Sequence, residues 1–237
     1  MTERHAGVHP AVAAALNPSL GAALGLDEEV LADVLAAFEV REVPRQARLF
    51  EQGEPGRSLY LVREGSLKLT RTTASGRPSI LAVLGPGDTV GEMSLLDGSA
   101  RTATATALTP AVVLELSQAR FDRWLADQPA AAPLLLRHLG RRLRASNDVI
   151  ADLVFADVPT RVARLVLKLA DQFGLEDERG VVMIEHQLTQ EELAQLVGSA
   201  RETVNKALAS FAGRGWIELG RRSIAVLDGE RLARFAR

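Results

Sequence analysis

Length, composition and charge are compatible with one large or two ordinary globular domains: 237 residues, 47% hydrophobic, 24% charged, with a formal net charge of -2. Because the chain has no cysteine, disulfides, thiolate zinc sites, iron–sulfur clusters and cysteine nucleophiles are excluded. The four histidines show no ligand spacing, so no metal is expected, and a near-neutral chain can still carry a local basic face for nucleic acid.

The first residues predict a flexible N-terminal tail, residues 1–22. The uncharged run over residues 11–26 is interrupted by Asn17 and Pro18 and lacks the basic flank of a signal peptide. No later segment reaches the roughly 18 to 20 apolar residues that a membrane-spanning helix needs, so we expect a cytoplasmic protein with no membrane partner. Behind Asp27, a short amphipathic helix is predicted from the helical spacing of Val30, Leu31, Val34, Leu35 and Phe38.

Short runs rich in Leu, Val and Thr follow between residues 40 and 116. They are SLYLV, SLKLT, ILAVL, TATATA and AVVLEL, and glycines separate them. Short strands at regular spacing with glycine between them predict an antiparallel sandwich or jelly roll. We assign residues 23–128 to this domain. It contains GEMSLLDGSART, residues 91–102, whose single glutamate and single arginine would by themselves indicate a solvated surface loop.

A helical region comes next, and its second helix predicts a dimer. Phe121, Trp124 and Leu125 mark a short helix, and a longer one begins near residues 129–133. Alternating steps of three and four residues give an a/d seam over about three heptads: Leu136, Leu139, Leu143, Ser146, Ile150 and Leu153. Arginines crowd both flanks, which favours a narrow parallel two-helix contact over packing within the chain. We assign residues 129–156 to this dimerisation helix. Ser146 and Asn147 are either polar register residues or contacts to something bound between subunits.

Residues 157–237 predict a winged helix-turn-helix. The ADVP segment, residues 156–159, predicts a hinge, since a residue before proline disfavours the helical region. After a helix and a short strand at 181–184, the segments TQEE and SARE match the capping-box pattern, with Thr189 and Ser199 as the caps. Gly198 separates the two helices, and GWIELGRRSIAVL predicts a two-stranded wing.

The second helix of this motif carries side chains suited to DNA. Its buried face is predicted from the spacing of Val204, Ala207, Leu208 and Phe211. Arginine can bind guanine O6 and N7, and glutamate can accept from cytosine N4. An ordinary solvated helix would contain the same residue types, but the paired caps, the glycine turn, the wing and the seam together favour DNA binding. The predicted DNA-binding residues are Thr189, Ser199, Arg201, Glu202, Thr203, Asn205, Lys206, Arg221 and Arg222.

Two segments resemble a known family. LTQEELAQLVGSARETVNKALASFAGRGWIEL together with GEMSLLDGSARTATA is similar to the cyclic-AMP receptor protein branch of the CRP/FNR transcription regulators, in particular its actinobacterial members. The resemblance covers about residues 27–237. It implies an α+β protein with an N-terminal β-roll that binds a cyclic nucleotide, a long dimerisation helix and a C-terminal winged helix-turn-helix. Lys206 departs from the arginine common in the family, which replaces a bidentate group by a point charge.

The resemblance also implies a ligand site for residues 91–102. In the family this segment is the phosphate-binding cassette, in which Glu92 would accept from the ribose 2′-hydroxyl, Arg101 would pair with the phosphate and Thr102 would donate to a phosphate oxygen. Ser146 and Asn147 match the family's adenine contacts on the dimerisation helix. The implied ligand-binding residues are Gly91, Glu92, Met93, Ser94, Arg101, Thr102, Ser146 and Asn147.

These expectations combine into a cyclic-AMP-responsive homodimer that binds double-stranded DNA at a TGTGA-type palindrome, with RNA polymerase as a further partner. The alternatives keep the fold but take another nucleotide, such as cyclic di-GMP, or bind DNA without any effector. An enzyme is disfavoured, because no nucleophile, base and orienting group occur together. A scaffold protein that uses only the seam would leave the wing and the outward residues unexplained.

Overall fold

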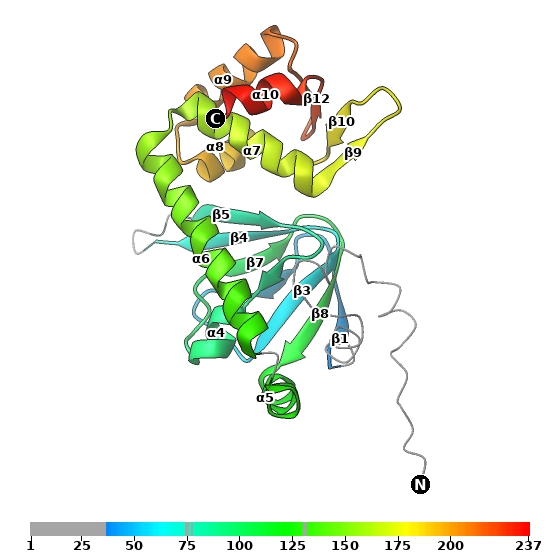
Figure 1. Ribbon diagram of the computed structural model, residues 1–237, viewed down its shortest axis with the longest axis vertical. Coiled ribbons are helices and arrows are strands. Elements are labelled where there is room, and N and C mark those ends of the chain that lie inside the picture. Colours follow the sequence, from blue (N-terminus) through cyan, green and yellow to red (C-terminus); the bar gives the residue numbers. More distant parts are fainter. Residues whose placement is uncertain (1–36, 74–75, 77, 130–131) are drawn as a thin grey trace. The chain divides into compact units, whose positions relative to one another are not determined.

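The computed structural model describes residues 37–73, 76, 78–129 and 132–237 (Figure 1). The side chains of residues 134 and 138 are not described. The predicted tail and nearly all of the predicted helix behind Asp27 lie outside these residues. The chain divides into two compact units. The first contains residues up to Leu67 together with Leu84–Arg144, and the second contains Lys68–Val83 together with Ala145–Arg237.

One antiparallel sheet in the first unit has the strand order β1-β8-β3-β6 (Figure 1). Its strands are β1 (Glu39–Val43), β3 (Ser58–Glu64), β6 (Thr89–Val90) and β8 (Ala111–Ser117). The register is fixed by pairs such as Leu61 opposite Leu114. Val113 and Leu114 are fully buried on β8, so this strand contributes side chains to the core from both of its faces.

A second four-stranded sheet has the order β2-β7-β4-β5. Its strands are β2 (Arg48–Phe50), β4 (Leu67–Thr72), β5 (Pro78–Leu84) and β7 (Thr104–Ala107). Each of the five predicted runs forms a strand, so the predicted antiparallel β domain is confirmed. Strands β1, β2 and β6 were not predicted, because they are short and carry charged or small residues without a long apolar run.

Three helices accompany these sheets: α4 (Glu92–Asp97), α5 (Gln118–Asp127) and α6 (Ala132–Phe155). Phe121 on α5 packs with Leu95 and Leu116, and Trp124 and Leu125 border this cluster. The short helix predicted from these aromatic residues is therefore confirmed. The long helix is confirmed as well, and it is continuous over 24 residues.

The second unit contains a helix-turn-helix and a small sheet. Its helices are α7 (Val158–Phe173), α8 (Gln190–Val197), α9 (Arg201–Gly213) and α10 (Gly229–Phe235), and its sheet has the order β11-β12-β10-β9. The strands are β9 (Gly174–Glu176), β10 (Val182–Ile184), β11 (Ile217–Leu219) and β12 (Ile224–Val226). Strands β11 and β12 form the predicted wing; β9 and α10 were not predicted.

The junction between α6 and α7 lies one residue earlier than the proline rule suggests. Asp157 is the N-cap of α7 and accepts a hydrogen bond from Thr160 N at 2.9 Å, and Val158 is already helical although it precedes Pro159. The N-cap therefore makes the break, and proline is tolerated within the first turn. The break between α6 and α7 therefore falls at Asp157, the second residue of the predicted hinge segment 156–159.

The second predicted capping box is not formed. Ala200, without a side-chain cap, precedes α9, whereas Ser199 donates its backbone N–H to Ala194 O at 3.0 Å. Gly198 is left-handed (φ 68°), so Ser199 completes the C-terminal cap of α8. Because Ser199 ends one helix it cannot begin the next, and the prediction that it caps α9 was wrong.

Candidate functional site

Two glycines bring the chain close together around α4. Gly91, just before the helix, has φ 86°, and a Cβ there would lie 2.4 Å from Arg101 Nη1. A Cβ on Gly56 would lie 2.1 Å from Ser94 Cβ. Ser94 is buried and donates to Ala100 O at 3.3 Å. Both positions therefore require glycine, one for its conformation and both for the space.

Arg101 is an almost fully buried cation, with 4% of its surface exposed. Its Nη1 donates to Gly91 O at 2.7 Å and its Nη2 donates to Ser58 O at 2.6 Å, whereas Nε–H is buried without a hydrogen-bond partner. Burial lowers the pKa of Arg101, and nearby Tyr60 and Glu92 favour the charged form. An arginine is not deprotonated in proteins, so the site holds a buried positive charge.

Glu92 places a carboxylate in the same region, with 6% of the residue exposed. Its Oε2 lies 3.0 Å from Arg142 Nη1 but lacks a hydrogen bond of good geometry. Arg142, on α6, also donates to Thr89 O at 3.0 Å. Arg142 was not among the predicted site residues, because fifty positions separate it from Glu92 and its sequence context shows only a run of arginines.

The remaining predicted ligand residues lie at the protein surface. Met93 on α4 is 53% exposed, and Thr102 directly after Arg101 is exposed. Ser146 and Asn147 are exposed on α6. The structure thus brings Gly91, Glu92, Ser94 and Arg101 together, whereas the other four predicted ligand residues are exposed.

Two aromatic rings that were not predicted from the sequence lie beside Arg101. The guanidinium carbon lies 4.3 Å from the ring centroid of Phe50 on β2 and 5.7 Å from that of Tyr60 on β3. The two rings are stacked at 5.9 Å. No local pattern connects these strands with residue 101, so only the folded structure reveals the contact.

The helix-turn-helix begins with a complete capping box. Thr189 N donates to Glu192 Oε2 at 2.8 Å, and Glu192 N donates to Thr189 Oγ1 at 3.2 Å. The predicted inner face of α9 is confirmed, since it is at most 5% exposed at each position: Val204, Ala207, Leu208 and Phe211. This packing fixes which side chains of α9 face outward.

The outward side chains of α9 form a mixed charged surface. Arg201, Glu202, Thr203 and Lys206 are exposed, and Asn205 is half-buried with an unpaired Oδ1. At the tip of the wing, Arg221 and Arg222 are exposed as well. Ser199 is half-buried in the turn and Thr189 is exposed at the start of α8. These groups match the donors and acceptors that base edges and phosphates require.

The apolar face of α6 is wider than the predicted seam. Four seam residues are 49–69% exposed, namely Leu136, Leu143, Ile150 and Leu153, and Leu139 is half-buried. Three further exposed apolar residues were not predicted, namely Val149, Val154 and Phe155. Leu153 also approaches the helix-turn-helix, because a Cβ on Gly198 would lie 2.8 Å from its Cδ2.

Neither a metal site nor a membrane span appears in the part of the chain that the structure describes. Histidine and acidic side chains there nowhere form a group of three that could hold a metal ion. Within the same residues, every helix is too short or too polar to cross a bilayer.

A β domain with a buried pair of opposite charges, followed by a winged helix-turn-helix, defines a class of ligand-binding transcription regulators. Residues 40–128 match the family model described as a cyclic nucleotide-binding domain, and residues 160–235 match the Crp-like helix-turn-helix domain. The chain belongs to the CRP/FNR family of transcription regulators, which is not an enzyme family.

The similarity to individual relatives extends over most of the chain. A CRP-like cAMP-activated global transcriptional regulator of Mycobacterium tuberculosis is 45% identical, with 90% of this chain and 95% of the relative covered. A cyclic AMP receptor protein of Thermus thermophilus is 36% identical, over 90% and 94% of the two chains. A solved CRP-family regulator from the same species has a TM-score of 0.69 at 31% identity, over 83% and 96%.

Proposed function

We propose that this protein is a cyclic-AMP-responsive, sequence-specific transcription regulator that acts in the cytoplasm as a homodimer. The observation that carries the proposal is the buried pair Glu92 and Arg101 beside the glycine turn that begins α4. The 45% identical M. tuberculosis relative is named as cAMP-activated, which supports cyclic AMP as the effector.

The two buried charges suit different parts of one nucleotide. Arg101 pairs with the cyclic phosphate, and Thr102 donates to a phosphate oxygen. Glu92 would repel an anion, so in this proposal it accepts from the ribose 2′-hydroxyl. Gly91, Met93 and Ser94 supply backbone around the phosphate, and Ser146 and Asn147 of α6 contact adenine.

The exposed face of α9 reads a TGTGA-type half-site in the major groove. Arg201 binds guanine, with Glu202, Asn205 and Lys206 beside it on the helix. Thr189, Ser199, Thr203, Arg221 and Arg222 contact phosphates. A dimer joined along α6 would place two α9 helices about 34 Å apart, one turn of DNA. RNA polymerase is a further partner in this proposal.

The switch requires a difference in affinity. Cyclic AMP can raise DNA affinity only if it binds the DNA-competent arrangement more tightly than the other arrangement. Because coupling between two sites is reciprocal, DNA should raise the affinity for cyclic AMP by the same factor.

The test is a fluorescence anisotropy titration of a labelled TGTGA palindrome with and without cyclic AMP. We expect cyclic AMP to tighten binding by about 5- to 150-fold, the range typical of coupled sites, and light scattering to give the mass of a dimer. A scrambled palindrome and the Arg101→Gln variant are the controls. Equal binding with and without cyclic AMP would contradict the effector, in which case cyclic di-GMP and other nucleotides are titrated in the same assay.

A further inference from the structure

Arg101 lies in a slot with aromatic rings on one side and glycine backbone on another. Its guanidinium carbon is 4.3 Å from the centroid of Phe50, a distance typical of a stacked cation–π contact. A Cβ on Gly56 would lie 3.2 Å from the same carbon, and one on Gly91 would lie 3.1 Å from it. A flat group fits this space, and a Cβ on either glycine would press against it.

The N–H groups at the edges of the guanidinium are only partly hydrogen-bonded. Two of its nitrogens donate to Ser58 O and Gly91 O, at 2.6 and 2.7 Å. Nε–H remains buried without a partner. Because a buried donor without an acceptor is costly, the orientation that leaves Nε–H free needs other contacts to stabilise it, and the Phe50 ring supplies the closest one.

Tyr60 differs from Phe50 in how its ring is held. Its hydroxyl donates to Glu115 Oε1 at 3.2 Å and accepts from Arg41 Nη1 at 3.5 Å. Burial and Glu115 raise the pKa of Tyr60, so its phenol stays neutral. Its ring centroid is 5.7 Å from the guanidinium carbon, farther than that of Phe50, and the two rings are stacked with their centroids 5.9 Å apart. Tyr60 therefore both stacks on Phe50 and lies near the cation, whose charged form it favours.

We propose that Phe50 is a positioning residue for the nucleotide phosphate, which fixes the plane of the Arg101 guanidinium before the ligand arrives. This inference rests on the proposed function, since it assigns the phosphate to Arg101. Ordering a side chain when a ligand binds costs conformational entropy. Because Phe50 already holds the guanidinium in place, this cost is lower and the affinity for the ligand is higher.

The test compares substitutions that keep or remove the ring. Phe50→Leu keeps an apolar side chain without a π face, and Phe50→Tyr keeps the face. We expect Phe50→Leu to weaken cyclic AMP binding by about 2- to 30-fold, which corresponds to a cation–π contact at a partly or fully desolvated site, and Phe50→Tyr to stay within about 2-fold. Calorimetry measures both.

A matched control separates positioning from packing. Leu49 is the adjacent residue on β2, is 5% exposed, and has no π face to stack on the guanidinium. Leu49→Ala should lower the melting temperature and leave the cyclic AMP affinity of the folded protein unchanged. If Leu49→Ala weakens binding as much as Phe50→Leu, the effect is general packing and the proposal is overturned.

A double substitution tests whether Phe50 acts through Arg101. Lysine lacks the planar group that stacks on a ring, so in an Arg101→Lys background we expect the loss caused by Phe50→Leu to shrink to less than about 2-fold. The same loss in both backgrounds would show that Phe50 acts elsewhere, which overturns the proposal.

A measurement on the ligand-free protein keeps the inference separate from the effector. In the NMR spectrum, the Nε proton of Arg101, assigned with Arg101→Lys, should be shifted upfield by the Phe50 ring and should lose this shift in Phe50→Leu. An unshifted resonance in the wild type overturns the slot whatever the ligand. If the shift is present and the wild type does not bind cyclic AMP, cyclic AMP is not the effector, but the contact between Phe50 and Arg101 is supported.

Discussion

The buried site around Glu92 and Arg101 and the outward face of α9 use charged residues in opposite ways. In the buried site, Glu92 and Arg101 are 6% and 4% exposed, and the arginine contacts backbone carbonyls and an aromatic ring. On α9, Arg201, Glu202 and Lys206 are exposed. A buried charge is costly to leave unpaired and insensitive to salt, whereas an exposed one is screened and acts mainly on contact with a partner. We therefore expect large effects of substitution in the buried site and smaller, salt-dependent effects on α9.

The largest effect should come from Arg101→Gln. It leaves Ser58 O and Gly91 O without their charged donor and removes the cation near Glu92. In the proposed function Arg101 pairs with the phosphate, and truncating one partner of a buried hydrogen-bonded charge pair costs about 2–5 kcal/mol of binding free energy, so we expect at least about a 30-fold loss of cyclic AMP affinity by calorimetry. Arg48→Gln, at an arginine whose side chain is 61% exposed, is the control. Comparable binding by Arg101→Gln and the wild type would contradict a role for the buried cation.

The second largest effect concerns the pH dependence of folding stability. The helix-turn-helix unit also contains a buried titrating group, His186. His186 is 4% exposed and its Nδ1 accepts from Leu188 N at 3.0 Å, just before α8. Burial lowers the pKa of His186 to about 4, from 6.5. The unfolded chain therefore binds a proton below pH 6.5 that the folded protein excludes, and stability falls as the pH drops from 6.5 to 4, by about 3 kcal/mol at 1.36 kcal/mol per pKa unit.

Urea unfolding at several pH values between 4 and 7 measures this dependence. His186→Asn keeps an acceptor near Leu188 N without a titrating ring, so its stability should fall less steeply over the same range. Parallel pH profiles for the wild type and His186→Asn would show that His186 does not cause the loss.

On α9 itself, Arg201→Ala should have an intermediate effect. If Arg201 binds guanine, the substitution weakens binding to the TGTGA palindrome by about 1–3 kcal/mol and relaxes the preference at one base pair. Anisotropy with a set of single-base variants measures both quantities. An equal loss on every sequence would instead assign Arg201 to a phosphate.

The smallest effect should come from Arg221→Ala at the wing. A phosphate contact carries no sequence information, so binding should weaken uniformly and the slope of log K against log salt should fall by about 1. Titrations at several salt concentrations measure the slope. A sequence-dependent loss would place Arg221 at a base edge.

The parts of the fold that follow from local pattern could be predicted from the sequence. The inner face of α9 follows from helical spacing, and the strands of the β domain follow from short apolar runs between glycines. The Thr189 capping box was predicted from four consecutive residues. Ser199 matched the same pattern, but the preceding helix uses its backbone N–H, which a four-residue pattern does not contain.

The surroundings of Glu92 and Arg101 could not be predicted, because they are made by residues far apart in the sequence. The resemblance named Glu92 and Arg101, but the contacts that fix Arg101 come from Phe50 and Ser58 on other strands. Arg142 reaches Glu92 from α6. Such contacts depend on strand order and register rather than on periodicity, so the sequence indicated the charges and not their surroundings.

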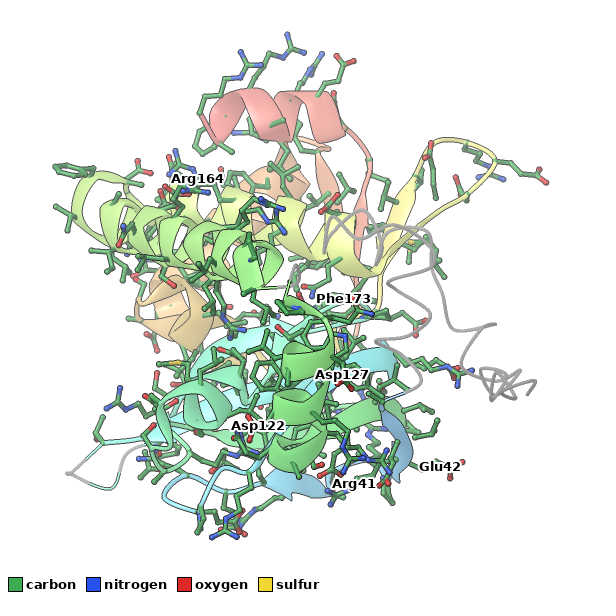
Figure 2. The ribbon with its side chains drawn as sticks, turned by 60° about the horizontal axis from the view of Figure 1, so that its bottom comes forward. Arg41, Glu42, Asp122, Asp127, Arg164 and Phe173 are labelled. Carbon is green, nitrogen blue, oxygen red and sulfur yellow. The ribbon has the colours of Figure 1, made fainter. Side chains whose placement is uncertain are left out.

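Arg164 on α7, labelled in Figure 2, has a practical consequence for handling the protein. It pairs with Asp152 on α6, and its Nε donates to Ala236 O at 2.7 Å. A purification tag fused after Arg237 would start two residues beyond this carbonyl, and trimming the last two residues would remove it. Expression vectors intended to preserve the contact between α7 and residue 236 should therefore keep residues 236 and 237.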